Sequence, residues 1–143
     1  MPDRAVIGDS PRRREDARFV AGHGAYLDDL RFDGVMHAVF LRSPHAHARI
    51  VAIDTTAART MPGVLAILTA ADAGADGLRP LRPTVEANVQ TAEPFRFLPQ
   101  PLLAEGRVRY AGEPVALVVA ETRSQALDAA ERIDVAYEPL PAV

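Results

Sequence analysis

Two histidines are the first residues in this sequence whose type and spacing could do chemistry. His45 and His47 stand two positions apart, so on a strand both imidazoles would face the same side and could bind a metal ion. Such a site would need further ligands, for which His37 and Asp29 are the candidates. The alternative, which we favour, is that both histidines hold a turn through hydrogen bonds.

Three other polar groupings match only part of a known pattern. Gly22-His23-Gly24 lacks the third glycine of a dinucleotide-binding loop, since leucine stands at position 27. Asp28, Asp29 and Asp33 lack the spacing and the closing glutamate of an EF-hand loop. Ser43 lies outside the G-x-S-x-G pattern of a nucleophile elbow. We therefore interpret all three groupings as turns.

A single carboxylate, Glu113, precedes the most apolar run of the chain and could meet a partner or a substrate channel there. The alternative, which we favour, is a tight turn. In that turn Gly112 would adopt an unusual backbone conformation, and Pro114 would hold Glu113 extended. Glu113 is therefore a candidate interface residue.

Basic side chains cluster in the run Arg12-Arg13-Arg14, which could be a nucleic-acid-binding arm. Glu15 and Asp16 follow at once and reduce the local positive field. Salt bridges to a neighbouring domain are the better interpretation. Arg14 is accordingly a candidate interface residue.

Composition excludes several classes of function. The 143 residues suit one domain, and the net charge of −3 provides no global attraction for nucleic acid. The sequence contains no lysine, which excludes a Schiff-base or P-loop lysine, and no cysteine, which excludes disulfides, iron–sulfur ligation and thiolate zinc sites. No apolar run approaches the ~20 residues of a membrane span, and no signal peptide is visible, so we expect a cytoplasmic protein without membrane contact.

The elements that must position these residues repeat in order. Hydrophobic patterns predict two strand–strand–helix–strand units, which favour an α+β fold with a mixed sheet. The expected strands are residues 35–42, 48–53, 64–69, 107–110, 115–120 and 134–138. The expected helices are a short turn at 16–20, a segment ending at Thr60, and one that begins with Thr122 and Gln125 at capping-box spacing.

The core is expected around the strand 115–120. The strand 35–42 is also expected to be covered on both faces, because nearly every position in it is apolar. Two sets of residues should pack on this strand. They are one face of the helix that follows it and three isoleucines from the first strand–strand–helix–strand segment: Ala126, Leu127, Ala130, Ile50, Ile53 and Ile67.

We expect an extended lead-in over residues 1–13 and one domain over residues 14–143. Residues 74–103 form a long proline-rich segment that joins the two units. A free linker of this length should be polar, yet this one is rich in apolar side chains, which indicates that it covers another surface. Its candidate interface residues are Phe95, Phe97 and Leu98.

Several strings, in this order, resemble the α/β-hammerhead domain of the molybdopterin-binding large subunit of molybdenum hydroxylases. That family includes xanthine dehydrogenase, aldehyde oxidase and aerobic carbon-monoxide dehydrogenase. The resemblance covers residues 7–143, nearly the whole chain. Its strings are Arg14-Glu-Asp-Ala-Arg-Phe-Val-Ala-Gly22, Tyr26-Leu-Asp-Asp29, Arg42-Ser-Pro-His-Ala-His-Ala-Arg-Ile50, Met61-Pro-Gly-Val64, Val108-Arg-Tyr-Ala-Gly-Glu-Pro-Val-Ala116 and Tyr137-Glu-Pro-Leu-Pro-Ala-Val143.

The resemblance implies an oxidoreductase that uses a molybdopterin cofactor, iron–sulfur clusters and FAD. The expected partners are the remaining domains of the large subunit and the iron–sulfur and flavin subunits. In the family the pterin ligands and the catalytic glutamate lie in later domains, so no catalytic, cofactor-binding or metal-binding residue can be assigned here. We expect the isolated chain to be an inactive scaffold domain that binds no cofactor. The alternatives are a standalone interaction module and, least favoured, a small independent enzyme.

Overall fold

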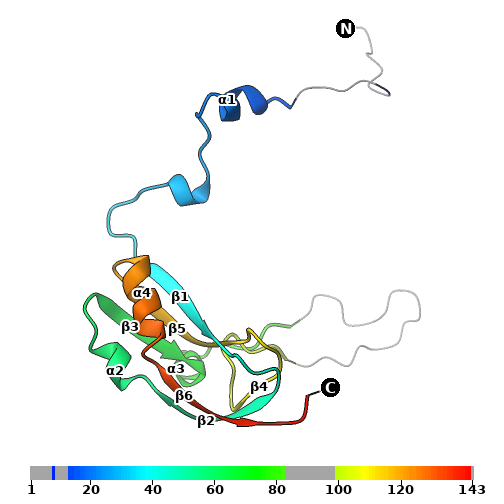
Figure 1. Ribbon diagram of the computed structural model, residues 1–143, viewed down its shortest axis with the longest axis vertical. Helices are drawn as coiled ribbons and strands as arrows, with labels where there is room; N and C mark the ends of the chain where they lie inside the picture. Colours follow the sequence, from blue (N-terminus) through cyan, green and yellow to red (C-terminus); the bar gives the residue numbers. More distant parts are fainter. Residues whose placement is uncertain (1–7, 9–12, 83–98, 143) are drawn as a thin grey trace. The chain divides into compact units, whose positions relative to one another are not determined.

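The computed structural model describes Gly8 and residues 13–82 and 99–142, and it divides into two compact units, 1–35 and 36–143 (Figure 1). The first unit contains two short elements, α1 (Asp16–Val20) and the 3₁₀ helix η1 (Leu27–Asp29). The helical turn predicted at residues 16–20 is confirmed. Neither element buries a residue, and the domain boundary expected after residue 13 stays a prediction.

The second unit contains the two predicted strand–strand–helix–strand runs, with one additional helix between them. The strands and helices of the first run are β1 (His37–Arg42), β2 (Ala48–Asp54), α2 (Thr56–Arg59) and β3 (Val64–Thr69), followed by α3 (Ala70–Ala75). Those of the second run are β4 (Arg107–Val108), β5 (Pro114–Ala120), α4 (Arg123–Ala130) and β6 (Asp134–Pro139). The α+β class is therefore confirmed.

The strands form two three-stranded sheets, in the orders β1-β5-β3 and β4-β2-β6, and every pairing is antiparallel. Each run thus supplies the central strand of the sheet whose edges belong to the other run (Figure 1). This differs from the single mixed sheet expected from the sequence. The reason is that the chain passes to the other sheet after each strand, so consecutive strands do not pair.

The core centres on β5, as predicted. Val115, Ala116, Val118 and Ala120 are fully buried, and α4 contacts all three strands of the first sheet. The helix packs through positions 126, 129 and 130, whose spacing of three and four residues defines one helix face, and Ile133 just beyond the helix joins the same cluster. Leu127 was expected on that face but is 42% exposed, because it lies one residue off the period. Of the three isoleucines, Ile67 is buried, whereas Ile50 and Ile53 are half-buried.

The expectation that the first strand is covered on both faces is wrong for this chain. Val39 and Leu41 pack against the core that includes α4. Phe40, which points to the opposite face, is 44% exposed. The same alternation leaves Leu68 of β3 37% exposed, so the face of the first sheet that turns away from α4 is apolar and only partly covered.

Candidate functional site

Two of the sequence strings that carry candidate polar residues form short turns, and each turn leads the chain directly from one sheet to the other. Residues 43–47 lead from β1 to β2, and residues 109–113 lead from β4 to β5. Both turns are five residues long, and they occupy equivalent places in the two runs. We call them the crossover turns.

The crossover turns are hydrogen-bonded to each other. The backbone N–H of Gly112 donates to the carbonyl of Ser43 over 2.8 Å, and the N–H of Ser43 donates to the carbonyl of Glu113 over 3.0 Å. The Arg42 guanidinium donates to the Gly112 carbonyl over 2.8 Å. Gly112 has φ +88°, the left-handed region that favours glycine, as the sequence predicted.

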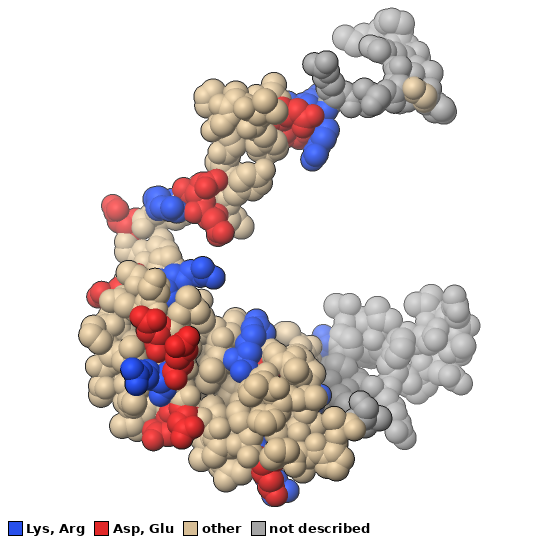
Figure 2. Space-filling model, viewed as in Figure 1, with Lys and Arg blue, Asp and Glu red and all other residues tan. Residues whose placement is uncertain are grey.

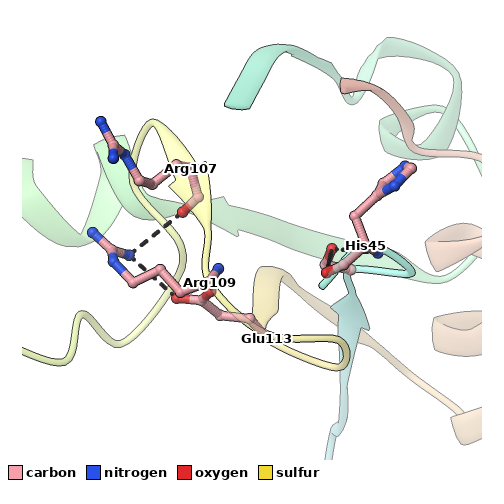
Figure 3. A network of polar contacts seen from close by, with 5 residues as sticks. His45, Arg107, Arg109 and Glu113 are labelled. Carbon is pink, nitrogen blue, oxygen red and sulfur yellow. Dashed lines mark hydrogen bonds and ion pairs between the residues drawn. The ribbon is translucent and has the colours of Figure 1, made fainter. Parts of the chain in front are cut away.

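Glu113 lies inside its own turn and is only 4% exposed. Its carboxylate accepts a short hydrogen bond from the backbone N–H of Arg109, and its other oxygen lies 3.4 Å from the Arg109 guanidinium (Figure 3). The backbone N–H of Glu113 donates to the Tyr110 carbonyl over 3.2 Å. The predicted tight turn is therefore what the structure contains, with the buried carboxylate bonded to the turn itself.

Ser43 has the corresponding role in the other crossover turn. It is 3% exposed, and its hydroxyl accepts from the backbone N–H of His45 over 3.0 Å. The His45 ring packs on Tyr137 with centroids 4.8 Å apart, and Nδ1 of His47 lies 2.7 Å from the carbonyl of Pro141. Burial raises the pKa of Tyr137, and a hydrogen bond with the Ser43 side chain partly opposes that rise. The predicted hydrogen bond is therefore present for the His47 ring, whereas the His45 ring contributes by packing on Tyr137 and only its backbone is hydrogen-bonded, to Ser43.

An apolar groove crosses the partly covered face of the first sheet. Three strands, the helix α3 and two loop segments form its walls. Figure 2 shows charged side chains gathered over the part of the unit that contains α2 and α4. The lining residues are Phe40, Leu68, Asp72, Ala73, Asp76, Leu78, Leu102, Leu103 and Leu117.

The predicted site residues do not form a single cluster. Arg14 is exposed beside α1 in the first unit, Glu113 is buried in a crossover turn, and Phe95, Phe97 and Leu98 lie outside the described residues. The groove residues Phe40 and Leu68 were not predicted from the sequence. Alternation within two otherwise continuous apolar strands was the only available signal, and it could not show which face α4 would leave open.

Within residues 13–82 and 99–142, no group of three His, Cys, Asp or Glu side chains lies close enough together to hold a metal ion. Iron–sulfur clusters are held mainly by cysteine thiolates, and the sequence has no cysteine. The described residues therefore do not fit a metal or iron–sulfur centre. Among these same residues, none of the helices has the length and hydropathy needed to cross a bilayer.

A protein-family model described as "Aldehyde oxidase and xanthine dehydrogenase, a/b hammerhead domain" matches residues 21–141. Two curated relatives are similar over nearly the whole chain. The nicotine 6-hydroxylase large subunit of Paenarthrobacter nicotinovorans is 47% identical, and the match covers 98% of this chain and 16% of the relative. The carbon monoxide dehydrogenase large chain of Afipia carboxidovorans is 43% identical, with 94% and 15% covered.

Solved structures show the same fold. Quinoline 2-oxidoreductase from Pseudomonas putida 86 superposes with a TM-score of 0.82 at 46% identity, over 94% of this chain and 16% of that one. A Cu,Mo-CO dehydrogenase superposes with a TM-score of 0.78 at 42% identity, over the same shares of both chains. The chain thus spans about one sixth of the length of these relatives.

Proposed function

The chain belongs to the aldehyde oxidase and xanthine dehydrogenase family, as its a/b hammerhead domain, and from that premise we propose that it is a non-catalytic scaffold and interface domain of a molybdenum-hydroxylase large subunit. The complete enzyme would hydroxylate a carbon centre with oxygen from water, or oxidise carbon monoxide. Molybdopterin, iron–sulfur clusters and FAD would be held by its other domains and subunits.

The single observation that supports this role most is the uncovered apolar face of the first sheet. Phe40, Leu68 and Leu117 line it from three neighbouring strands. A sheet normally buries one face and exposes a polar one, but here α4 covers one face and the other is also apolar. A contiguous exposed apolar surface of this kind is typical of an interface.

The proposed partner of this face is the remainder of the large subunit. The chain spans about one sixth of the length of its relatives, so most of such a subunit would be available to cover it. Arg14, Phe95, Phe97 and Leu98 remain proposed contributors to the contact. Glu113 would contribute through its turn, because its own carboxylate is buried.

A single introduced thiol tests this proposal, since the chain contains no cysteine of its own. Leu68→Cys places the thiol in the groove, and Leu127→Cys places a matched control on α4, which covers the opposite face of the sheet. Maleimide labelling of each variant is compared between the isolated chain and the complete enzyme, with peptides resolved by mass spectrometry. We expect labelling at position 68 to be slowed roughly tenfold or more in the enzyme, because local opening would then be needed for access.

Equal labelling rates at position 68 in the isolated chain and in the enzyme would overturn the proposed interface. The reading frame beyond codon 143 separates the scaffold role from the alternative of a standalone interaction module. A frame that continues for several hundred codons supports the scaffold role, and a stop codon favours the module.

A further inference from the structure

We propose that the crossover turn of residues 109–113 is a recognition loop. Tyr110 is its anchor and enters an apolar pocket rimmed by carboxylates on the remainder of the large subunit. Glu113 is the positioning residue that fixes the loop before contact. This inference rests on the proposed scaffold function and deepens it by naming a specific contact and its chemistry.

Exposure distinguishes this loop from an ordinary connection. The Tyr110 side chain is 45% exposed, and Ala111 beside it is also exposed. Tyrosine and arginine are enriched among the residues that contribute most to protein–protein binding, because each buries a large area with few rotatable bonds or several directed donors. Arg109 precedes Tyr110 in the loop, so both favoured residue types stand side by side.

Rigidity is the second observation. Hydrogen bonds hold the loop from inside and outside. Within it, the backbone and guanidinium of Arg109 donate to the Glu113 carboxylate, and the Glu113 N–H donates to the Tyr110 carbonyl. From outside, two bonds are exchanged with Ser43, and Arg42 donates to the Gly112 carbonyl. A loop that is already fixed loses little conformational entropy when it binds. Exposed aromatic groups on fixed loops are therefore suited to recognition.

The buried carboxylate of Glu113 is the central part of this arrangement. Burying a charged group costs free energy unless it is paired and hydrogen-bonded. Here the carboxylate accepts from the Arg109 N–H and approaches the Arg109 guanidinium. The Glu113 side chain therefore links the last residue of the loop to the first, with Tyr110 between them. Loss of the charge would loosen the loop without removing any surface that a partner touches.

The surroundings of Tyr110 indicate the partner's chemistry. Arg42 lies against the Phe40 ring, 5.6 Å from its centroid, and donates to the Gly112 carbonyl, so the groove and the loop form one continuous surface. Arg42 and Arg109 are both exposed, whereas the nearby Glu113 is buried. A pocket with an apolar floor and carboxylates at its rim complements a tyrosine whose loop contains one exposed arginine, Arg109, and is contacted by another, Arg42.

The experiment uses a reporter thiol at the neighbouring exposed position, Ala111→Cys, in the complete enzyme and in the isolated chain. Labelling is measured in four backgrounds: parent, Tyr110→Ala, Glu113→Gln and the double variant. We expect roughly tenfold protection in the parent enzyme, because the docked loop must open before it reacts. Tyr110→Ala and Glu113→Gln should each remove most of that protection, and the double variant should lose no more than Tyr110→Ala alone.

That non-additivity separates positioning from a merely structural role. If Glu113 acted only on stability, Glu113→Gln would increase labelling by the same factor with and without Tyr110, and the positioning role would be overturned. Glu113→Gln removes the ion pair with the Arg109 guanidinium, which loosens the loop, but glutamine retains an acceptor for the Arg109 N–H. Because the lost ion pair is partly exposed, the isolated variant should keep a melting temperature within a few degrees of the parent.

The groove reporter at Leu68 keeps the two proposals distinguishable. Protection at position 68 with free labelling at position 111 would overturn the recognition loop and leave the scaffold function standing. Free labelling at both positions would overturn both. Protection at position 111 that Tyr110→Ala does not reduce would show that the loop is covered but that Tyr110 is not its anchor.

Discussion

At the level of single residues, small side chains dominate the core of the second unit. Of the fourteen buried apolar residues in the described part of the chain, eight are alanines. Alanine lets α4 approach the first sheet closely, so few positions have space for a larger or charged group. Val118 is the clearest example, since it is fully buried and pairs with both Val39 and Ile67 in the neighbouring strands.

Val118→Asp should therefore abolish soluble folded protein. An unpaired carboxylate at this position would cost several kcal/mol, against a total stability of roughly 5–15 kcal/mol. Val51→Asp is the matched control, because Val51 is 63% exposed on β2. The measurement is the melting temperature of the soluble fraction of each variant, followed by circular dichroism and compared with that of the parent. A Val118→Asp protein that melts within a few degrees of the parent would contradict the position of β5 in the core.

Gly112→Ala should destabilise the chain by about 1–2 kcal/mol, because its positive φ is unfavourable for any residue with a Cβ. Gly74→Ala in α3 should instead stabilise the chain, because there is open space around the added methyl group and alanine favours the helix. Urea unfolding of both variants provides the measurement. Equal shifts of the same sign would show that the crossover turn is not held in this conformation.

At the level of elements, capping boxes mark the start of α4 and of α3. Thr122 accepts from the backbone N–H of Gln125 over 3.2 Å, and Gln125 accepts in return from the Thr122 N–H over 3.0 Å. The three-residue spacing of Thr122 and Gln125 predicted this capping box from the sequence. In α3, Thr69 and Asp72 have the same three-residue spacing. This helix was not predicted, because the prolines that follow indicated an irregular connection from residue 74 onward.

The α3 cap makes stability depend on pH. Hydrogen bonds from the Thr69 hydroxyl and backbone N–H lower the pKa of Asp72. A folded-state pKa below the unfolded value of about 3.9 gives stabilisation that is present above that value and lost as pH falls through the folded pKa. Below pH 5 the melting temperature of Asp72→Asn should therefore fall less than that of the parent. Asp128→Asn, an exposed position on α4, is the control and should follow the parent curve.

Local pattern predicted most of these elements, and tertiary structure decided the rest. Alternation and turn residues predict the six strands in their observed order, and the five-residue α1 is predicted to the residue. Local periodicity indicates where a strand lies but not which distant strand it pairs with, so the division into two interlocked sheets could not be predicted. For the same reason the sequence indicated that Glu113 stands in a turn, but not that its carboxylate is buried against Arg109.

For the whole chain, the interlocked sheets make the two runs of the second unit interdependent. Fragments 1–82 and 99–143 would each contain two edge strands of one sheet without the strand between them. We expect neither fragment to unfold cooperatively alone, and an equimolar mixture to recover the spectrum of the intact chain. Circular dichroism and size-exclusion chromatography of the separate and mixed fragments measure this. A cooperative melting transition in either fragment alone would contradict it.

Arg14 lies outside this interlocked region, in the first unit, beside a helix with no buried residue. Arg14→Ala should therefore leave the melting temperature of the isolated chain nearly unchanged. The proposed interface role predicts weaker assembly of the complete enzyme, seen as a smaller assembled fraction in native mass spectrometry. A large drop in the melting temperature of the isolated chain would assign Arg14 to the stability of this domain instead.

The exchange of central strands also has a consequence during protein synthesis. When β3 has left the ribosome, β1 and β3 are both complete, but β5 lies about fifty residues further along the chain. At roughly 5–20 residues per second, the nascent chain spends several seconds with open strand edges and no partner to fill the gap. Codon choice and chaperone capture over that interval should therefore influence the yield of native protein more than the stability of the finished domain does.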